Sequence, residues 1–357
     1  QTALSNRNLI INGDMQCWQR ATSATAAANG YSTVDRWYMT ENTDGAYTTE
    51  RSTDHPFSSG YSLKCQVTTA DTSLSAAQSA FLDHYIEAQN LQHLNYGTSN
   101  AKSLTLSFWV KSNKTGTYTI SLYKQDSTAY MYTKEYTISS ANTWEKKIIT
   151  ISPTAGSTSF ITSSGGAIAN DNGSGLGLSH GLAWGSNFTG GTSDSWSSTV
   201  ANYSTTNHVN WMDSTANNFY LAQVQLEVGE QATPFEHRSF ADELRRCQRY
   251  YYRIASGQYA FFAMGRVISG QVPVAPITFP TAMRVTPSIT MLNGAIWYNN
   301  AGNITTASSP AVIYSSNLSE VTTVDVRFAN NSGLNGSAEP MAFAFNPAGY
   351  IDFSSEL

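Results

Sequence analysis

Between residues 103 and 112 the chain reads SLTLSFWVKS, and apolar side chains alternate with polar ones at every second position. One face of this stretch carries Leu104, Leu106, Phe108 and Val110. The opposite face carries Thr105, Ser107 and Trp109. Because successive side chains of a strand point to opposite sides of the sheet, the pattern predicts a β-strand with one side in a hydrophobic core. Trp109 is then expected on the other side.

Similar short patterns recur through the first two thirds of the chain, at residues 36–41, 61–68, 117–125, 130–138 and 143–151. Clusters of Asn, Asp, Gly and Ser separate them, as is typical of turns. Many short strands at such intervals predict two antiparallel sheets packed face to face, a jelly-roll sandwich, and disfavour a closed barrel. The glycine-rich run at 163–191 predicts long surface loops around a strand at 176–184, because glycine is costly to order in a core.

The pattern changes decisively between Leu226 and Arg253. From Ser239 onwards apolar residues recur at helical spacing, which predicts a helix from Ser239 to about Tyr252 with Ser239 as its N-cap. The apolar stripe of this helix consists of Phe240, Leu244, Cys247 and Tyr251. Because an exposed stripe of this size is unusual, we expect the helix to pack against the domains before and after it.

After the helix the sequence returns to β character, with four prolines suited to strand ends or edges at positions 273, 276, 280 and 287. A chain of 357 residues is long enough for two cores. We predict a β-sandwich at 1–228, a linker and helix at 229–253, and a smaller C-terminal β-sandwich at 254–357. The predicted fold class is therefore all-β with one linking α-helix.

The composition narrows the classes of partner. Charged residues make up 13% of the chain, the net charge is -5 and the pI is about 5.7. This balance lacks the basic surface that nucleic-acid backbones require, so we expect no nucleic-acid partner. No apolar run approaches the roughly 18 residues of a membrane span, and residues 1–8 lack the regions of a signal peptide. We expect no membrane insertion and a protein that is soluble when made; whether sequence precedes Gln1 stays open.

Catalytic and metal-binding motifs are missing from the sequence, which contains no GxSxG, HExxH, Walker A or Rossmann fingerprint. Cys17, Cys65 and Cys247 are far apart and predict three reduced thiols. The histidines show no i,i+4 pair, so a metal site would need the fold to gather them. Three acids could in principle form a glycosidase pair, namely Asp83, Glu87 and Asp213. Nothing links them, and we expect no enzyme activity, no catalytic residues, no cofactor and no bound metal.

Aromatic residues in polar loops are the remaining candidate chemistry. Sugar C–H faces stack on flat rings, and amides and carboxylates bind sugar hydroxyls. The glycan-binding candidates are Trp184, Asn187, Trp196, Tyr203, Asn210, Trp211 and Asp213. We expect the three tryptophans to lie at or near one surface built from loops. The alternative interpretation is that these rings cap the sandwich core or pack at a subunit interface.

Three stretches are similar to segments of many bacteriophage virion proteins. They are NLIINGDMQCWQR with the VDRW of 34–37, the segment containing QLEVG, ATPFEHRS and ADELRRCQRYYY, and FPTAMRVTPSIT at 279–290. In such proteins a jelly-roll domain like a carbohydrate-binding module is joined to a C-terminal β domain. The resemblance covers most of the chain and implies a fibre, tail or head-decoration protein of the virion, made in the cytoplasm of the bacterial host.

The same resemblance implies adsorption to host surface polysaccharide, contacts with other virion proteins, and a homo-oligomer, expected to be a trimer. The run Tyr250–Tyr252 also favours self-association, because consecutive aromatics on a helix cannot all face one core. Related modules often hold calcium next to aspartates of the last strand. Here that strand reads Tyr220 to Val224 without acids, so this calcium is not expected, although Asp14 and Glu227 remain available as ligands. A purely structural virion subunit and a glycan hydrolase remain as alternatives.

Overall fold

The computed structural model describes residues 6–24, 29–255, 261–268, 272–292, 295–298, 304–307, 310–314, 321–328, 340–345 and 349–357. The chain divides into two compact units. The first consists of Gln1–Glu243 together with Leu357, and the second of Leu244–Glu356. In the described residues, no helix is long and apolar enough to cross a membrane.

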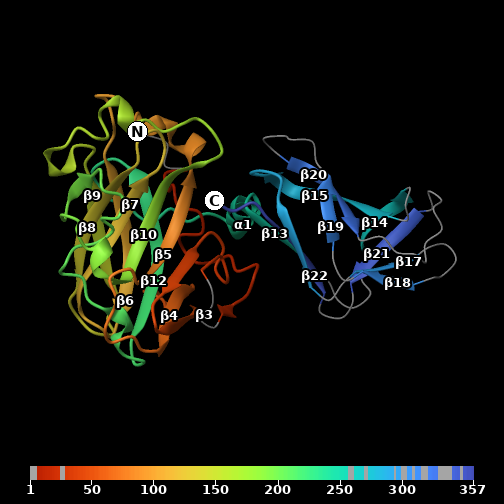
Figure 1. The fold of residues 1–357 in the computed structure, drawn as a ribbon, viewed down its shortest axis with the longest axis horizontal. Coiled ribbons are helices and arrows are strands. Elements are labelled where there is room, and N and C mark those ends of the chain that lie inside the picture. The colour runs from red at the N-terminus through yellow and green to blue at the C-terminus, as the bar shows by residue number, and fades with distance from the viewer. Residues whose placement is uncertain are drawn as a thin grey trace. The chain divides into compact units, whose positions relative to one another are not determined.

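Two antiparallel sheets form the first unit, and each has six strands in the described part of the chain (Figure 1). Sheet A contains, in spatial order, β1 (Ser23–Ala24), β3 (Ala46–Ser52), β4 (Ser62–Thr69), β12 (Asn218–Val228), β6 (Leu104–Ser112) and β9 (Glu145–Ile151). Sheet B contains β11 (Ser195–Ser197), β8 (Tyr130–Ile138), β7 (Gly116–Lys124), β10 (Ser174–Trp184), β5 (Ser79–Glu87) and β2 (Tyr38–Asn42). The predicted all-β sandwich is confirmed.

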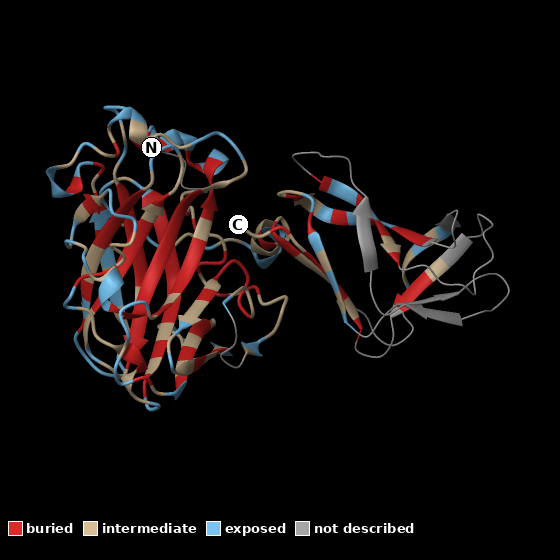
Figure 2. Cartoon of the chain, viewed as in Figure 1, coloured by how far each residue is buried: buried red, intermediate tan, exposed pale blue. Residues whose placement is uncertain are grey.

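The hydrophobic core lies between the two sheets, whose central strands are largely buried (Figure 2). Leu104, Leu106, Phe108 and Val110 of β6 are fully buried in it. Trp37 and Trp211 are also fully buried, and the Trp211 ring meets Tyr47 edge to face at 5.8 Å. Burial of large rings accounts for much of the stability of such a core, because each removes a large apolar area from water.

The loops between the strands carry five short 3-10 helices in the described residues: η1 (Ala88–Leu94), η2 (Ala155–Ser157), η3 (Ser164–Gly166), η4 (Ser186–Phe188) and η5 (Trp211–Asp213). The N-terminal segment runs along β12. The Leu9 N–H donates to the Leu226 carbonyl at 2.8 Å, and the Val224 N–H donates to the Gly13 carbonyl at 2.8 Å. The first and last segments of the sandwich are therefore neighbours.

The predicted helix exists but is shorter than expected: α1 spans Phe240–Gln248. Ser239 caps it as predicted, since its hydroxyl oxygen accepts from the Asp242 N–H at 3.2 Å. The expected apolar stripe of the helix is wrong at its first residue, Phe240, and at its last, Tyr251. Phe240 is 60% exposed, and Tyr251 belongs to the following strand and not to the helix. Aromatic residues at 250–252 favour strand over helix and explain the early end.

The second unit is also made of antiparallel strands. In its described residues one sheet contains β13 (Tyr251–Ala255), β22 (Tyr350–Ser354) and β16 (Ser288–Leu292). The other contains β18 (Ile304–Ala307), β17 (Ala295–Tyr298), β21 (Pro340–Phe345), β14 (Phe261–Ile268), β15 (Val272–Met283), β20 (Val321–Phe328) and β19 (Pro310–Tyr314). Pro276 lies opposite Asp325 of β20, beyond the Val272–Val274 part of β15 that pairs with β14 in the described residues.

Candidate functional site

The outer face of sheet A carries a groove, and its floor begins with the polar side of β6. Trp109 points to this face because its neighbours Phe108 and Val110 point into the core. Across the sheet Trp109 lies opposite Lys146 of β9 and Ala222 of β12. The outward position of Trp109 therefore agrees with the sequence pattern.

A β-bulge in β12 adds an amide to the floor. The pairing of β12 with β6 shifts between Ala222 and Gln225, and Gln223 adopts a left-handed backbone with a φ of 49°. A bulge of this kind re-aims a side chain relative to regular alternation. The Gln223 side chain lines the groove together with Ser107. The bulge thus supplies a hydrogen-bonding group beside the aromatic platform.

Two chain segments, residues 53–61 and 229–238, form the walls. The groove has a volume of about 500 Å³ and is lined by Phe57, Ser107, Trp109, Lys146, Gln223, Ala232, Thr233, Pro234, Phe235 and His237. Phe57 is 52% exposed and meets Trp109 edge to face, with ring centroids 5.6 Å apart. On the other wall the Phe235 and His237 rings lie 5.1 Å apart. Two aromatic corners therefore frame an open space.

Polar contacts hold both walls onto the sheet. Asp54 accepts a hydrogen bond from the Trp144 indole N–H at 2.9 Å and forms an ion pair with Lys111. Burial alone raises the pKa of Asp54, but the hydrogen bonds from Lys111 and Trp144 outweigh it and hold the pKa below its ordinary value. On the other wall the Thr105 hydroxyl donates to the Gly229 carbonyl at 2.7 Å. The groove is thus anchored by the strand that forms its floor.

Glu227 anchors the second wall further along. Its carboxylate accepts from the Thr233 N–H at 2.8 Å and from the Thr233 hydroxyl at 2.7 Å. Glu227 was one of two acids left available for calcium by the sequence; here it stabilises a turn. Because both hydrogen bonds come from one residue, the position of the neighbouring Pro234 and Phe235 is well defined.

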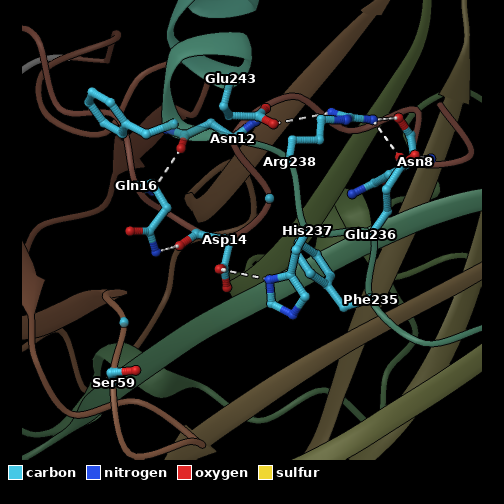
Figure 3. A pocket seen from close by; sticks show the side chains of 13 residues that line it. Asn8, Asn12, Asp14, Gln16, Ser59, Phe235, Glu236, His237, Arg238 and Glu243 are labelled. Carbon is cyan, nitrogen blue, oxygen red and sulfur yellow. Dashed lines mark hydrogen bonds and ion pairs between the residues drawn. The ribbon is translucent and has the colours of Figure 1, made fainter. Parts of the chain in front are cut away.

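A second pocket of about 370 Å³ shares Phe235 and His237 with the groove and is shown in Figure 3. At its centre Asp14 lies between two histidines. One carboxylate oxygen of Asp14 is 3.5 Å from His55 Nε2, and the other is 4.0 Å from His237 Nδ1. The His55 side chain is 2% exposed, whereas that of His237 is 71% exposed. The fold thus gathers two histidines that the sequence leaves 182 positions apart.

Along the same pocket Glu236 and Arg238 hold the N-terminal segment (Figure 3). Glu236 accepts from the N–H groups of Arg7 at 3.2 Å and Asn8 at 2.9 Å, and its carboxylate is 2.9 Å from the Arg238 guanidinium. Burial raises the pKa of Glu236, but the Asn8 N–H and the charge of Arg238 outweigh it and hold the pKa below its ordinary value. We call these contacts the Glu236 clamp.

No metal centre is formed by this pocket. Across the part of the chain that the structure describes, no three His, Cys, Asp or Glu side chains gather into a group able to hold a metal ion. Asp14 lies within 4.0 Å of both histidine side chains, and these contacts become ion pairs only when the imidazole is protonated.

The three tryptophans expected on one surface are buried, and that expectation is wrong. Trp184, Trp196 and Trp211 are 6%, 2% and 0% exposed. Trp184 stacks against Phe81 and against Tyr203, with centroid distances of 4.7 and 5.0 Å, and these two rings also lie 5.8 Å from each other. The alternative interpretation, in which the rings pack on the sandwich core, describes Trp196 and Trp211, whereas Trp184 packs in a separate aromatic cluster.

Backbone carbonyls make this burial possible for two of the rings. The Trp196 indole N–H donates to the Ser152 carbonyl at 2.9 Å, and that of Trp211 donates to the Asn218 carbonyl at 3.1 Å. A buried indole needs such an acceptor, because an unpaired N–H is costly away from water. The polar context that suggested a sugar site therefore supplies the partners for packing.

The remaining candidates serve separate local structures. Tyr203 is half-buried against Trp184, and Asn187 is exposed in η4. The Asn210 side chain caps η5 by accepting from the Met212 N–H at 3.0 Å. Asp213 forms an ion pair with Lys114 at 2.6 Å. These residues are not assembled with the three tryptophans into one surface.

The three acids considered for hydrolysis also have structural partners. Asp83 lies in β5 and accepts hydrogen bonds from the hydroxyls of Tyr85, at 3.0 Å, and Ser179. Burial raises the pKa of Asp83 to about 7. Glu87 is fully buried and accepts from the Gln89 amide at 2.6 Å. Both acids are therefore buried and occupied by hydrogen bonds within the fold.

Sequence reasoning identified Trp109 as an outward-facing ring but missed Phe57, Lys146, Gln223 and Phe235. Lys146 was accessible to the same reasoning, since it belongs to a strand whose alternation could be read. Gln223 was not, because a bulge interrupts the alternation only where the partner strand requires it. Phe57 and Phe235 reach the groove through loops, whose paths local periodicity does not encode.

Comparisons with known proteins return no matching family model and no matching curated sequence. Solved structures with a similar fold include a protein from Bacteroides thetaiotaomicron described as sugar-binding, with a TM-score of 0.36, 13% identity, and 62% of this chain and 100% of that chain covered. Another is the family 11 carbohydrate-binding module from Clostridium thermocellum in complex with a mixed-linked tetrasaccharide, with a TM-score of 0.28, 10% identity, and 60% and 99% covered.

A third similar structure is the enzymatically active domain of bacteriophage CBA120 tailspike protein 4, with a TM-score of 0.29 and 12% identity. The match covers 62% of this chain and 21% of that chain, so this protein spans about a fifth of the tailspike structure. These similarities concern the fold alone. The chain is an all-β protein whose first unit is a sandwich of two antiparallel sheets.

Proposed function

We propose that the first unit binds glycans through the groove on the outer face of sheet A. The observation that carries this proposal is the pairing of two aromatic corners, Phe57 with Trp109 and Phe235 with His237, around an open space of about 500 Å³. A sugar ring presents flat C–H faces that stack on such rings. The exposed ring of Phe57 and the ring of Trp109 both line this space and are placed for this contact.

The polar side chains that line the groove match the hydroxyl groups of a sugar. Gln223 offers an amide donor and acceptor, Ser107 a hydroxyl, and Lys146 an ammonium group. Pockets for small molecules typically combine apolar surface with a few such convergent groups. The groove is open and lies along a sheet face, so it suits a chain of sugars more than a single enclosed one.

We further propose that this protein is a component of a phage particle, a fibre, tail or head-decoration protein, that attaches to polysaccharide of the host surface. The support is the resemblance of three stretches to phage virion proteins, including NLIINGDMQCWQR and FPTAMRVTPSIT. Several weakly binding grooves on one particle act together through avidity, so a single groove need not bind tightly.

A glycan array with the full chain tests the binding proposal. Trp109→Ala should lower the affinity for any bound glycan about 10- to 100-fold, the equivalent of roughly 1 to 3 kcal/mol for a lost aromatic contact. Phe57→Ala should act in the same direction. Phe188→Ala, a change of a half-buried ring in η4 outside the groove, is the matched control and should leave binding unchanged.

Other outcomes select the alternatives. An array without any bound glycan, or binding that survives both Trp109→Ala and Phe57→Ala in folded protein, would favour a purely structural virion subunit. Release of short oligosaccharides from bacterial surface polysaccharide would instead indicate a hydrolase. Antibody labelling of intact phage particles tests the virion proposal by itself, and absence of label from purified particles would contradict it.

A further inference from the structure

The groove carries positive charge and no acid. Among its ten lining residues, all of them described by the structure, the groups that can be charged are the Lys146 ammonium and the His237 imidazole. Acids occur beyond its end, in the second pocket, where Asp14, Glu236 and Glu243 line the wall. Those carboxylates face partners of their own, since Glu236 and Glu243 pair with Arg238 and Asp14 lies between the two histidines.

Lys146 differs from the lysines around it. Lys147 pairs with Glu145 at 2.6 Å, Lys64 with Glu50 at 2.6 Å, and Lys111 with Asp54. Lys146 is exposed and has no carboxylate within 4.0 Å among the residues that the structure places. In the sheet it lies directly opposite Trp109, so an ammonium group and an indole ring border the same space. This combination binds a sugar face and an anion attached to it.

We propose that the groove is selective for acidic glycans, whose sugars carry a carboxylate or a phosphate, and that Lys146 contacts this anion. The inference rests on the proposed glycan binding and names its ligand class. An ammonium group binds carboxylate and phosphate alike, as a point charge. Lys146 therefore requires a negatively charged substituent on the sugar, and the experiment determines which of the two anions is bound.

Matched probes make the test sharp. Oligogalacturonate and its fully methyl-esterified form share one sugar backbone, and the ester replaces each charged carboxylate by a neutral group; phosphomannan differs from mannan in carrying phosphate. With the full chain, at least one acidic probe or acidic array glycan should bind about tenfold more tightly than its neutral counterpart, the weight of one charge-assisted hydrogen bond. Added salt should weaken this binding, because the ammonium is solvent-exposed and screened.

Lys146→Gln should remove the preference for the acidic form and the salt dependence, while weak binding of the neutral form persists. Lys102→Gln changes an exposed lysine outside the groove and controls for the lost net charge. Trp109→Ala should weaken both forms equally. Carboxylated and phosphorylated probes reported separately show which anion is recognised.

Two failures are distinguishable. If glycans bind but neutral and acidic forms bind equally, or if Lys146→Gln retains the full preference, the acidic selectivity is wrong and the glycan-binding proposal stands. If no glycan binds at all, neutral or acidic, the proposed function itself fails and the selectivity fails with it. Unfolding midpoints of each variant, measured alongside, exclude loss of the fold as the cause.

Discussion

Three histidines of the first unit have lowered pKa values: His84 and His180 are fully buried and His208 is half-buried. Burial lowers the pKa of His180 to about 3 and that of His208 to about 4, and it lowers the pKa of His84 well below its ordinary value. His180 lies between the sheets, 4.9 Å from the ring of Phe108. Neither of its ring nitrogens has a hydrogen-bond partner in the described part of the chain. These histidines are kept neutral by the core.

This burial predicts loss of stability in acid. A histidine whose folded pKa lies below its unfolded value of about 6.5 contributes fully above that pH, and its contribution is lost as the pH falls towards the folded pKa. For His180→Leu we expect the loss of unfolding free energy between pH 7 and 4.5 to be smaller than in the unchanged protein by about 2 kcal/mol. Urea unfolding at the two pH values measures it.

Asp83 has the opposite effect on the pH dependence of stability, so every protein that is compared must retain it. Its folded pKa of about 7 is raised by burial, so its contribution is complete below the unfolded pKa of about 3.8 and is lost as the pH rises through about 7. His93→Leu, at an exposed position of η1, is the control. Equal pH dependence in the His180 and His93 variants would contradict the prediction.

Single residues were predictable from the sequence where the signal was local. The outward position of Trp109 follows from its place in an alternating strand, and strands keep that alternation in any sandwich. The burial of Trp196 and Trp211 depends on which backbone carbonyl meets each indole N–H, Ser152 in one case and Asn218 in the other. These hydrogen bonds form only in the folded chain, so the polar residues near each tryptophan in the sequence did not distinguish an exposed ring from a buried one.

At the scale of elements, the strands were predictable and their interruptions were not. The stretches 103–112, 117–125, 130–138 and 143–151 correspond to β6, β7, β8 and β9 within a few residues. The end of α1 was misplaced because Tyr251 continues the helical spacing of its stripe although the chain has already entered β13. Pairing with β22 decides that boundary, and β22 lies about a hundred residues later.

Gly13 offers an element-scale prediction. A Cβ atom at this position would lie 2.1 Å from the Val224 carbonyl oxygen, and this backbone belongs to β12 and cannot yield as a side chain could. Gly13→Ala should therefore push the N-terminal segment away from β12 and lower the unfolding free energy by about 1 to 3 kcal/mol. Denaturant titration of both proteins measures the difference.

The control for this change is Gly173→Ala, where an added Cβ meets only the end of the Asp171 side chain at 3.0 Å. That variant should remain within about 0.5 kcal/mol of the unchanged protein. Because Val224 follows Gln223, Gly13→Ala should also weaken glycan binding by displacing the bulge. Unchanged stability of Gly13→Ala would mean that the segment is not fixed to β12 in solution.

At the scale of the whole chain, composition and strand spacing were enough to predict an all-β protein, and the two compact units divide within α1, between Glu243 and Leu244.

The argument for self-association from three consecutive tyrosines needs correction. Tyr250 and Tyr251 are 1% and 3% exposed within the chain, and the run leaves the helix before Tyr251. Consecutive side chains of a strand point to opposite faces, so neighbouring tyrosines can each be buried within the chain, which was not expected of a helix.

A homotrimer therefore remains a prediction that rests on the resemblance to phage fibre and tail proteins. Light scattering of the purified chain over a concentration series should give three times the chain mass of 38.8 kDa. A strict monomer at micromolar concentration and above would contradict it, and a dimer would retain self-association while removing the threefold symmetry.

The Glu236 clamp determines how the sandwich responds to pulling. The chain enters the sandwich at Asn8 and leaves it at Arg238, and the clamp joins these two places through Glu236. A mechanical force applied between the two ends therefore passes across a few hydrogen bonds and ion pairs and bypasses the strands of the core. Stretching would break the Glu236 clamp first and extend the chain segments that it joins, while the sheets and the groove on them stay folded under tension.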